Sequence, residues 1–84
     1  MRKEMVVQIA GGLEARPIAV LVQVASQYES SIYVRCEEKK VNAKSIMGMM
    51  SLGLAAGDEV EVSAEGKDEQ VAMDNIEKYL SNHE

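Results

Sequence analysis

Residues 5–25 read M-V-V-Q-I-A-G-G-L-E-A-R-P-I-A-V-L-V-Q-V-A, and they contain a change of apolar spacing that decides the fold. Apolar side chains first occupy every second position, at Met5, Val7 and Ile9, as in a strand with one buried face. After two glycines, the apolar positions are three and four residues apart, as on one face of a helix. The stretch therefore predicts a strand that leads directly into a helix.

The start of this helix is marked by Pro17. Proline is tolerated in the first turn of a helix, because the N–H that it lacks would have no partner there. The helix should therefore begin near Arg16. Its buried stripe is expected to consist of Ile18, Leu21, Val22 and Ala25.

The remaining strands and the fold class follow from the same spacing rules. Alternating apolar residues predict strands at residues 32–36, 40–42 and 60–64, with E-E-K as the turn between the first two. With two further helices, the order is strand, helix, strand, strand, helix, strand, helix. This order predicts one α+β domain over residues 1–84, a sheet with helices on one face, of which the ferredoxin-like plan is the generic version.

Two positions mark the starts of the later helices. Ser45 is a good N-cap for a short helix from Ile46 to about Leu52. Asp68 can cap a last helix. The apolar stripe expected for that helix is Val71, Ala72, Ile76, Tyr79 and Leu80.

Composition excludes several classes of function. The 84 residues allow one domain, and 46% hydrophobic residues are ordinary for a globular chain. A net charge of −5 disfavours direct binding of nucleic acid, and the absence of Trp and Phe disfavours a stacking surface for single strands. No apolar run approaches the roughly 20 residues of a membrane span, and no signal peptide is expected. The single Cys36 makes no internal disulfide, so the chain is expected to be cytoplasmic.

Charge is unevenly distributed along the chain. Residues 1–56 hold seven basic and five acidic residues, a balance of +2, whereas residues 57–84 hold two basic and nine acidic residues, a balance of −7. A site for an anion is therefore expected in the first part of the chain. The acidic residues of the second part are expected on wet faces of a strand and a helix.

The first candidate for chemistry is G-G-L-E-A-R-P at residues 11–17. Its glycines form a turn that ends against a helix N-terminus, where free N–H groups and Arg16 favour an anion. An ordinary strand-to-helix turn with proline in its first helical turn explains the same residues. Glu14 is likewise either a functional residue or an ordinary carboxylate near the positive end of a helix.

The second candidate is V-N-A-K-S-I-M-G-M-M-S-L at residues 41–52. As an N-cap, Ser45 satisfies a backbone N–H, and this alone could explain the residue. A phosphate on Ser45 would also be well placed, because it would meet the positive end of the helix and the charge of Lys44.

The helix predicted directly after Ser45 holds three of the six methionines. Helical spacing directs Met49 and Leu52 to the inner face, which leaves Ile46, Met47 and Met50 toward water. Exposed methionine is adaptable and favours a partner surface, although a small core also uses methionine as filler. Both interpretations stay open at this point.

The other reactive residue types form no recognisable site. Cys36 lies on the inward face of a predicted strand and is expected in the core. His83 is the one histidine and is next to the last residue. Neither a zinc site nor a catalytic triad fits this inventory, so no metal, cofactor or enzyme activity is expected.

The two motifs together resemble the HPr family, the histidine-containing phosphocarrier proteins of the bacterial sugar phosphotransferase system. The family's first motif is G-L-H-A-R-P, compared with G-L-E-A-R-P at residues 12–17. Its second motif, K-S-I-M-G-x-M-S-L, matches residues 44–52. Motif separation, chain length and element order also match. The resemblance implies an HPr-like open-faced β-sandwich, in which three helices cover one side of four antiparallel strands.

One departure from the family pattern bears on function. Family members carry phosphate from enzyme I on the histidine of the first motif, and Glu14 occupies that position here. A carboxylate is a much weaker nucleophile than imidazole, so the carrier activity is expected to be absent. The chain is similar to the Crh type, HPr-like proteins that lack the histidine and keep the serine. Those known have Gln at the histidine position, so Glu14 is a further departure.

The Crh-type resemblance implies a regulatory role. HPr kinase/phosphorylase would phosphorylate Ser45, and the product would bind a LacI-type regulator such as CcpA as corepressor in carbon catabolite repression. Partner contacts would then come from Arg16, Ile46, Met47 and Met50. The resemblance also implies homodimers formed by exchange of the first strand. Two alternatives remain: a diverged phosphocarrier that uses Glu14 or another residue, and a paralogue with its own partner in which Glu14 is a fixed charge.

Overall fold

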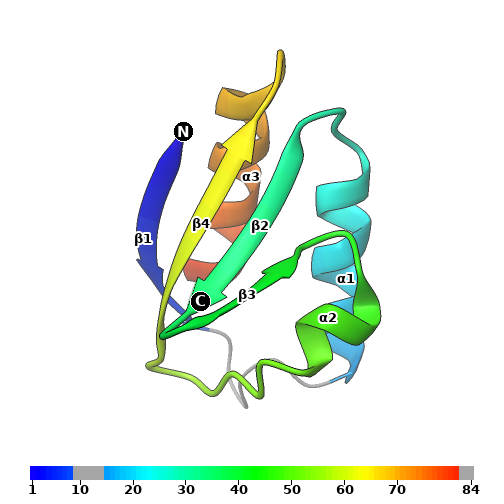
Figure 1. The fold of residues 1–84 in the computed structure, drawn as a ribbon. Helices are drawn as coiled ribbons and strands as arrows, with labels where there is room; N and C mark the ends of the chain where they lie inside the picture. Colours follow the sequence, from blue (N-terminus) through cyan, green and yellow to red (C-terminus); the bar gives the residue numbers. More distant parts are fainter. Residues whose placement is uncertain (9–14, 82–84) are drawn as a thin grey trace.

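The computed structural model describes residues 1–8 and 15–81, and this part of the chain contains four strands and three helices (Figure 1). Their order is that predicted from the sequence. In chain order they are β1 (Arg2–Val6), α1 (Ala15–Ser26), β2 (Ser31–Cys36), β3 (Lys39–Asn42), α2 (Ile46–Met50), β4 (Glu59–Glu65) and α3 (Glu69–Ser81).

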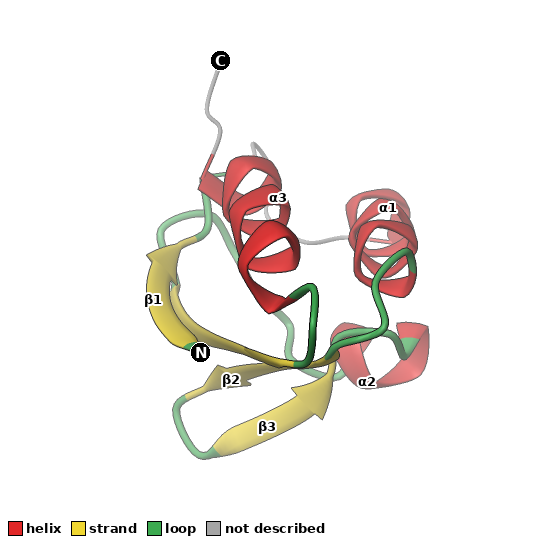
Figure 2. Ribbon diagram, turned by 90° about the horizontal axis from the view of Figure 1, so that it is seen from above, coloured by secondary structure: helices red, strands yellow, loops and turns green. Residues whose placement is uncertain are grey.

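The strands form one antiparallel sheet in the order β1-β4-β2-β3. Val62 of β4 pairs with Lys3 of β1 on one side and with Val34 of β2 on the other. Helices α1 and α3 cover one face, and α2 lies beside α1 and next to β3 (Figure 2). The opposite face carries no helix from the described part of the chain, so the α+β prediction is confirmed.

The core lies between the sheet and the helices. All four residues predicted for the buried stripe of α1 are buried, as are the alternating residues Val60, Val62 and Ala64 of β4. Cys36 was expected in the core but is only half-buried, at the end of β2. Partial burial is the main reason that the pKa of its thiol is raised, and the negative charges of Glu37 and Asp58 add to this effect.

The buried stripe of α3 differs from the predicted one at its start. Val71 is 50% exposed, whereas Met73 is buried together with Ala72, Ile76 and Leu80. A helix turns by about 100° per residue, and this directs Val71 away from the side shared by the four buried residues. The first apolar residue after Asp68 is therefore on the solvent side.

Asp68 connects the turn before α3 to the loop before β2. Its carboxylate accepts hydrogen bonds from the backbone N–H of Glu29 at 2.8 Å, from the N–H of Ser30 at 3.0 Å and from the Ser30 hydroxyl. The bond from the Ser30 hydroxyl is the main reason that the pKa of Asp68 is lowered. Gly66 also lies close to Ser30, because a Cβ at residue 66 would be 2.6 Å from the Ser30 Oγ.

No helix in the described ranges is both long and apolar enough to cross a membrane.

Candidate functional site around Ser45

The chain reaches Ser45 through a turn that Asn42 organises at the end of β3. The side-chain oxygen of Asn42 accepts a hydrogen bond from the backbone N–H of Lys44 at 2.8 Å. The backbone carbonyl of Asn42 accepts one from the N–H of Ser45 at 3.0 Å. Between them, the buried Ala43 donates its N–H to the Ile32 carbonyl at 2.9 Å. Such local bonds of Asn favour a turn over continued strand. Ser45 is thereby fixed to an edge strand of the sheet.

Ser45 is the N-cap of α2, as the sequence predicted. Its backbone is extended, with φ −108° and ψ 115°, and its Oγ accepts a hydrogen bond from the Gly48 N–H at 3.1 Å. This bond satisfies one of the N–H groups that a helix start leaves without a partner. The side chain is half-buried, so the hydroxyl is held in place while part of the residue remains in contact with solvent.

The other end of α2 is held by Lys39, a residue that sequence reasoning did not single out. Its Nζ donates to the Ser51 carbonyl at 2.8 Å, and the Ser51 hydroxyl donates to the Gly48 carbonyl at 2.6 Å. A cation at the C-terminal end of a helix is favourable. The helix ends at Met50, earlier than the predicted end near Leu52, because Ser51 caps it.

Lys44, the cation next to Ser45 in the sequence, makes a hydrogen bond to the segment that follows α1. Its Nζ donates to the carbonyl of Tyr28, just after α1, at 2.7 Å. Tyr28 lies in the connection between α1 and β2, and the long lysine side chain reaches its carbonyl. One of the three donors of the Lys44 ammonium group is therefore used to hold the turn before Ser45 against the segment after α1.

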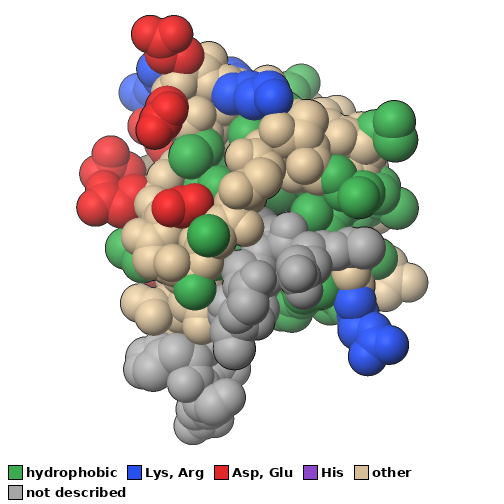
Figure 3. Space-filling model, turned by 90° about the horizontal axis from the view of Figure 1, so that it is seen from below, with side chains coloured by type: hydrophobic (Ala, Val, Ile, Leu, Met, Phe, Trp, Pro, Cys, Tyr) green, Lys and Arg blue, Asp and Glu red, His purple; other side chains and the backbone are tan. Residues whose placement is uncertain are grey.

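An exposed apolar surface follows Ser45 on α2. Met47 is 82% exposed, Met50 is 50% exposed and Ile46 is 47% exposed, whereas Met49 of the same helix is fully buried. We call Ile46, Met47 and Met50 the α2 patch. Figure 3 shows hydrophobic side chains gathered on the right-hand side, where α2 lies, and acidic side chains on the opposite side. The predicted exposure of these three residues is confirmed.

Arg16 is exposed in the first turn of α1, the helix that packs beside α2. Its guanidinium group makes no hydrogen bond or ion pair with a residue in the ranges 1–8 and 15–81. Glu14 and the glycines before it lie outside the described residues, and so does His83. The first motif is thus represented in the structure by its last residues.

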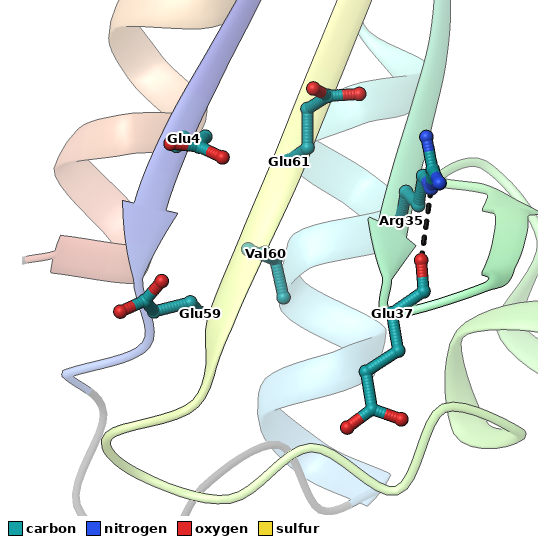
Figure 4. A pocket seen from close by; sticks show the side chains of 6 residues that line it. All are labelled: Glu4, Arg35, Glu37, Glu59, Val60 and Glu61. Atoms are coloured by element: carbon teal, nitrogen blue, oxygen red, sulfur yellow. Dashed lines mark hydrogen bonds between the residues drawn. The ribbon is translucent and has the colours of Figure 1, made fainter.

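A second surface feature lies on the open face of the sheet, away from α2. A hollow of about 410 Å³ is lined by Glu4, Arg35, Glu37, Glu59, Val60 and Glu61 (Figure 4). The Arg35 Nε donates to the Glu37 carbonyl at 2.9 Å. The carboxylates of β4 lie on its wet face, as predicted. No group of three His, Cys, Asp or Glu side chains suited to a metal ion occurs in the described part of the chain.

Comparison with known proteins assigns the chain that carries this site to a family. The family model described as "PTS HPr component phosphorylation site" matches residues 1–82. This chain belongs to the HPr family. The Ser45 turn and the α2 patch are therefore features of an HPr-family domain.

The relatives of this HPr-family chain include both phosphocarriers and Crh proteins. The HPr-like protein Crh of Bacillus subtilis (strain 168) is 42% identical over 80 residues, which are 95% of this chain and 94% of Crh. The phosphocarrier protein HPr of Bacillus anthracis str. Ames superposes with a TM-score of 0.93 at 38% identity over 95% of both chains. Bacillus subtilis Crh, solved as an intertwined dimer with a swapped domain, superposes with a TM-score of 0.80 at 44% identity over 92% of this chain and 88% of Crh.

Proposed function

We propose that this protein is an HPr-like regulatory protein that is switched by phosphorylation of Ser45. HPr kinase/phosphorylase would transfer the phosphoryl group from ATP to the Ser45 hydroxyl. The observation that carries the proposal is the adjacency of a half-exposed N-cap serine and the exposed α2 patch. One surface then offers both apolar contact area and a modifiable hydroxyl.

The proposed partner is a LacI-type regulator such as CcpA, which the phosphorylated protein binds as corepressor in the cytoplasm. The α2 patch supplies apolar contacts, because exposed methionines adapt to a partner surface. Phosphate on Ser45 supplies a charge that an Arg or Lys of the regulator can bind. Arg16 adds a polar contact from the neighbouring helix α1. The B. subtilis relative is described as a catabolite repression protein, which supports this role.

The direct test is mass spectrometry after incubation with an HPr kinase and ATP. We expect one added phosphate, located on Ser45, in the wild-type protein and none in Ser45→Ala. The phospho-form should then bind the regulator in a titration in which the unmodified protein does not. A Ser45→Ala protein that accepts as much phosphate as the wild type would disprove the choice of residue.

We further propose that the protein is no enzyme and does not relay phosphate from enzyme I, because Glu14 stands where the family motif has histidine. Incubation with enzyme I and labelled phosphoenolpyruvate should leave the wild type unlabelled. Glu14→His should acquire label, since Arg16 and the start of α1 are retained. Stable label on the wild type would instead support the alternative, a diverged carrier with an unusual phosphoacceptor.

Exchange of β1 between two copies is the proposed route to a homodimer. β1 is an edge strand that pairs only with β4 among the described strands. The swapped-domain dimer of the B. subtilis relative supports this proposal. Light scattering after size exclusion should detect a species of twice the 9.2 kDa chain mass.

A further inference from the structure

Gly48 is a glycine in the middle of α2 that the backbone does not require. The glycines with positive φ in the described part of the chain are Gly53, Gly57 and Gly66, so Gly48 has a conformation that other residues adopt. Glycine is also among the poorest helix formers. An alanine at this position would favour the helix. The reason for glycine must therefore lie in the space around it.

That space lies between Ser45 and the edge strand β3. A Cβ at residue 48 would lie 3.3 Å from the Ser45 Oγ and 3.3 Å from the Val41 Cβ. Both distances are shorter than a comfortable contact between these atoms. Val41 is half-buried and packs against the core. The Ser45 Oγ is itself held by the Gly48 N–H at 3.1 Å.

We infer that Gly48 is a positioning residue for the phosphorylation of Ser45, because its lack of a side chain leaves room for a phosphoryl group on one side of the Oγ. This inference rests on the proposed function. During transfer, the Oγ–P bond forms while the bond from the γ-phosphorus of ATP to its bridging oxygen breaks. ADP leaves with that electron pair, and the hydroxyl proton passes to a base of the kinase.

A methyl group at residue 48 would compete for that room. The phosphorus and its three oxygens need a much larger volume than the hydroxyl hydrogen. In the unmodified protein, the 3.3 Å contacts require the neighbours to shift by only a few tenths of an ångström. After phosphorylation, the same methyl group would contact the phosphate, which is bulky and charged. The alanine should therefore penalise the phosphorylated form more than the unmodified one.

The test compares Gly48→Ala with Gly53→Ala. Gly53 follows α2 with a φ of 59°, and a Cβ there meets nothing within 4 Å. We expect Gly48→Ala to keep or raise the unfolding temperature but to lower the rate of Ser45 phosphorylation about tenfold, equivalent to about 1.4 kcal/mol in the barrier. Gly53→Ala should do the reverse: lower the unfolding temperature through backbone strain and leave the phosphorylation rate unchanged.

A second measurement separates the phosphate from kinase recognition. The 84-residue chain with phosphoserine at position 45 can be made by chemical ligation, with either Gly or Ala at position 48. We expect phosphate to lower the unfolding temperature of the Ala form and to change that of the Gly form less. Equal shifts in the two chains would overturn the inference.

The possible outcomes distinguish failure of the proposed function from failure of the inference about Gly48. If the wild type takes no phosphate on Ser45, the proposed function fails, and the inference fails with it. If wild type and Gly48→Ala are phosphorylated at equal rates, only the role of Gly48 is refuted. If unmodified Gly48→Ala is unfolded, the space beside Ser45 serves folding, and the inference is also refuted.

Discussion

The ammonium nitrogen of Lys44 lies 2.7 Å from the carbonyl oxygen of Tyr28, and this bond connects the turn before α2 to the segment that follows α1. The residue immediately before Ser45 is thereby anchored to the helix layer, while Asn42 anchors the same turn to the sheet. Ser45 is thus presented from a turn that is held on two sides. A phosphate added there would meet a site whose backbone is already fixed.

We expect Lys44→Met to destabilise the protein by about 1–2 kcal/mol, because it leaves the Tyr28 carbonyl without its charged donor. The methionine keeps most of the apolar stem, so packing changes little. Urea unfolding followed by circular dichroism measures the effect. Lys67→Met, at an exposed position, is the control and should stay within about 0.5 kcal/mol of the wild type. Equal effects of the two substitutions would show that the Tyr28 contact contributes nothing.

Asp68 should make stability depend on acid pH. Its pKa is lowered in the folded protein, mainly by the Ser30 hydroxyl. A depressed carboxylate pKa adds stability that is present above the unfolded pKa of about 3.9 and is lost as pH falls through the folded pKa. Asp68→Asn should therefore be less stable than the wild type at pH 7, and the difference should shrink in strong acid.

The control for this prediction is Asp74→Asn, which removes a carboxylate from an exposed position of α3. Urea unfolding of the three proteins across the acid range provides the comparison. A difference between wild type and Asp68→Asn that stays constant from pH 7 into strong acid would refute the linkage.

Glu37 offers a test of backbone strain in the turn between β2 and β3. It is the one residue other than glycine with positive φ in the described ranges, at 58°. Glycine adopts this conformation without a steric penalty, so Glu37→Gly should stabilise the protein by about 0.5–1 kcal/mol. Glu38→Gly, in the same turn but without positive φ, should destabilise it by a similar amount. Differential scanning calorimetry distinguishes the pair, and shifts of the same sign would contradict the strain argument.

Local rules were enough to predict the N-cap at Ser45 and the exposed side of α2. Serine before an apolar run predicts an N-cap, and helical spacing separates buried Met49 from exposed Met47. The contacts of Lys39 and Lys44 could not be predicted, because each side chain reaches a carbonyl that only the tertiary fold brings near. Sequence gives no means of choosing among the acceptors that a long flexible side chain can reach.

The same limit applies to Asp68 and Val71. The position of Asp68 before a helix is readable from the sequence, but its bonds to Ser30 cross 38 positions of chain. Apolar spacing predicts that α3 has a buried stripe, yet the exact rotation of the helix on the sheet decides that Met73 is buried instead of Val71. That rotation is set by the packing of the whole stripe, which no single residue reveals.

The exposed and buried methionines of α2 should separate binding from stability. Met47→Ala removes a side chain that is 82% exposed, so the free energy of unfolding should change by less than about 0.5 kcal/mol. The same substitution should weaken binding of the Ser45-phosphorylated protein to its regulator by about 1 kcal/mol or more, as at many interface anchors. Isothermal titration with the phospho-form, combined with urea unfolding of the unmodified form, measures both quantities.

Met49→Ala is the matched control, because it removes the same side chain from the buried face of the same helix. It should cost about 2–5 kcal/mol of stability through lost packing and a cavity. At a temperature where this variant remains folded, its phospho-form should bind the regulator nearly as well as the wild type, since Met49 offers no surface to a partner. If Met47→Ala leaves binding unchanged while Met49→Ala abolishes it, binding depends on how α2 packs on the sheet and not on direct contact with the α2 patch.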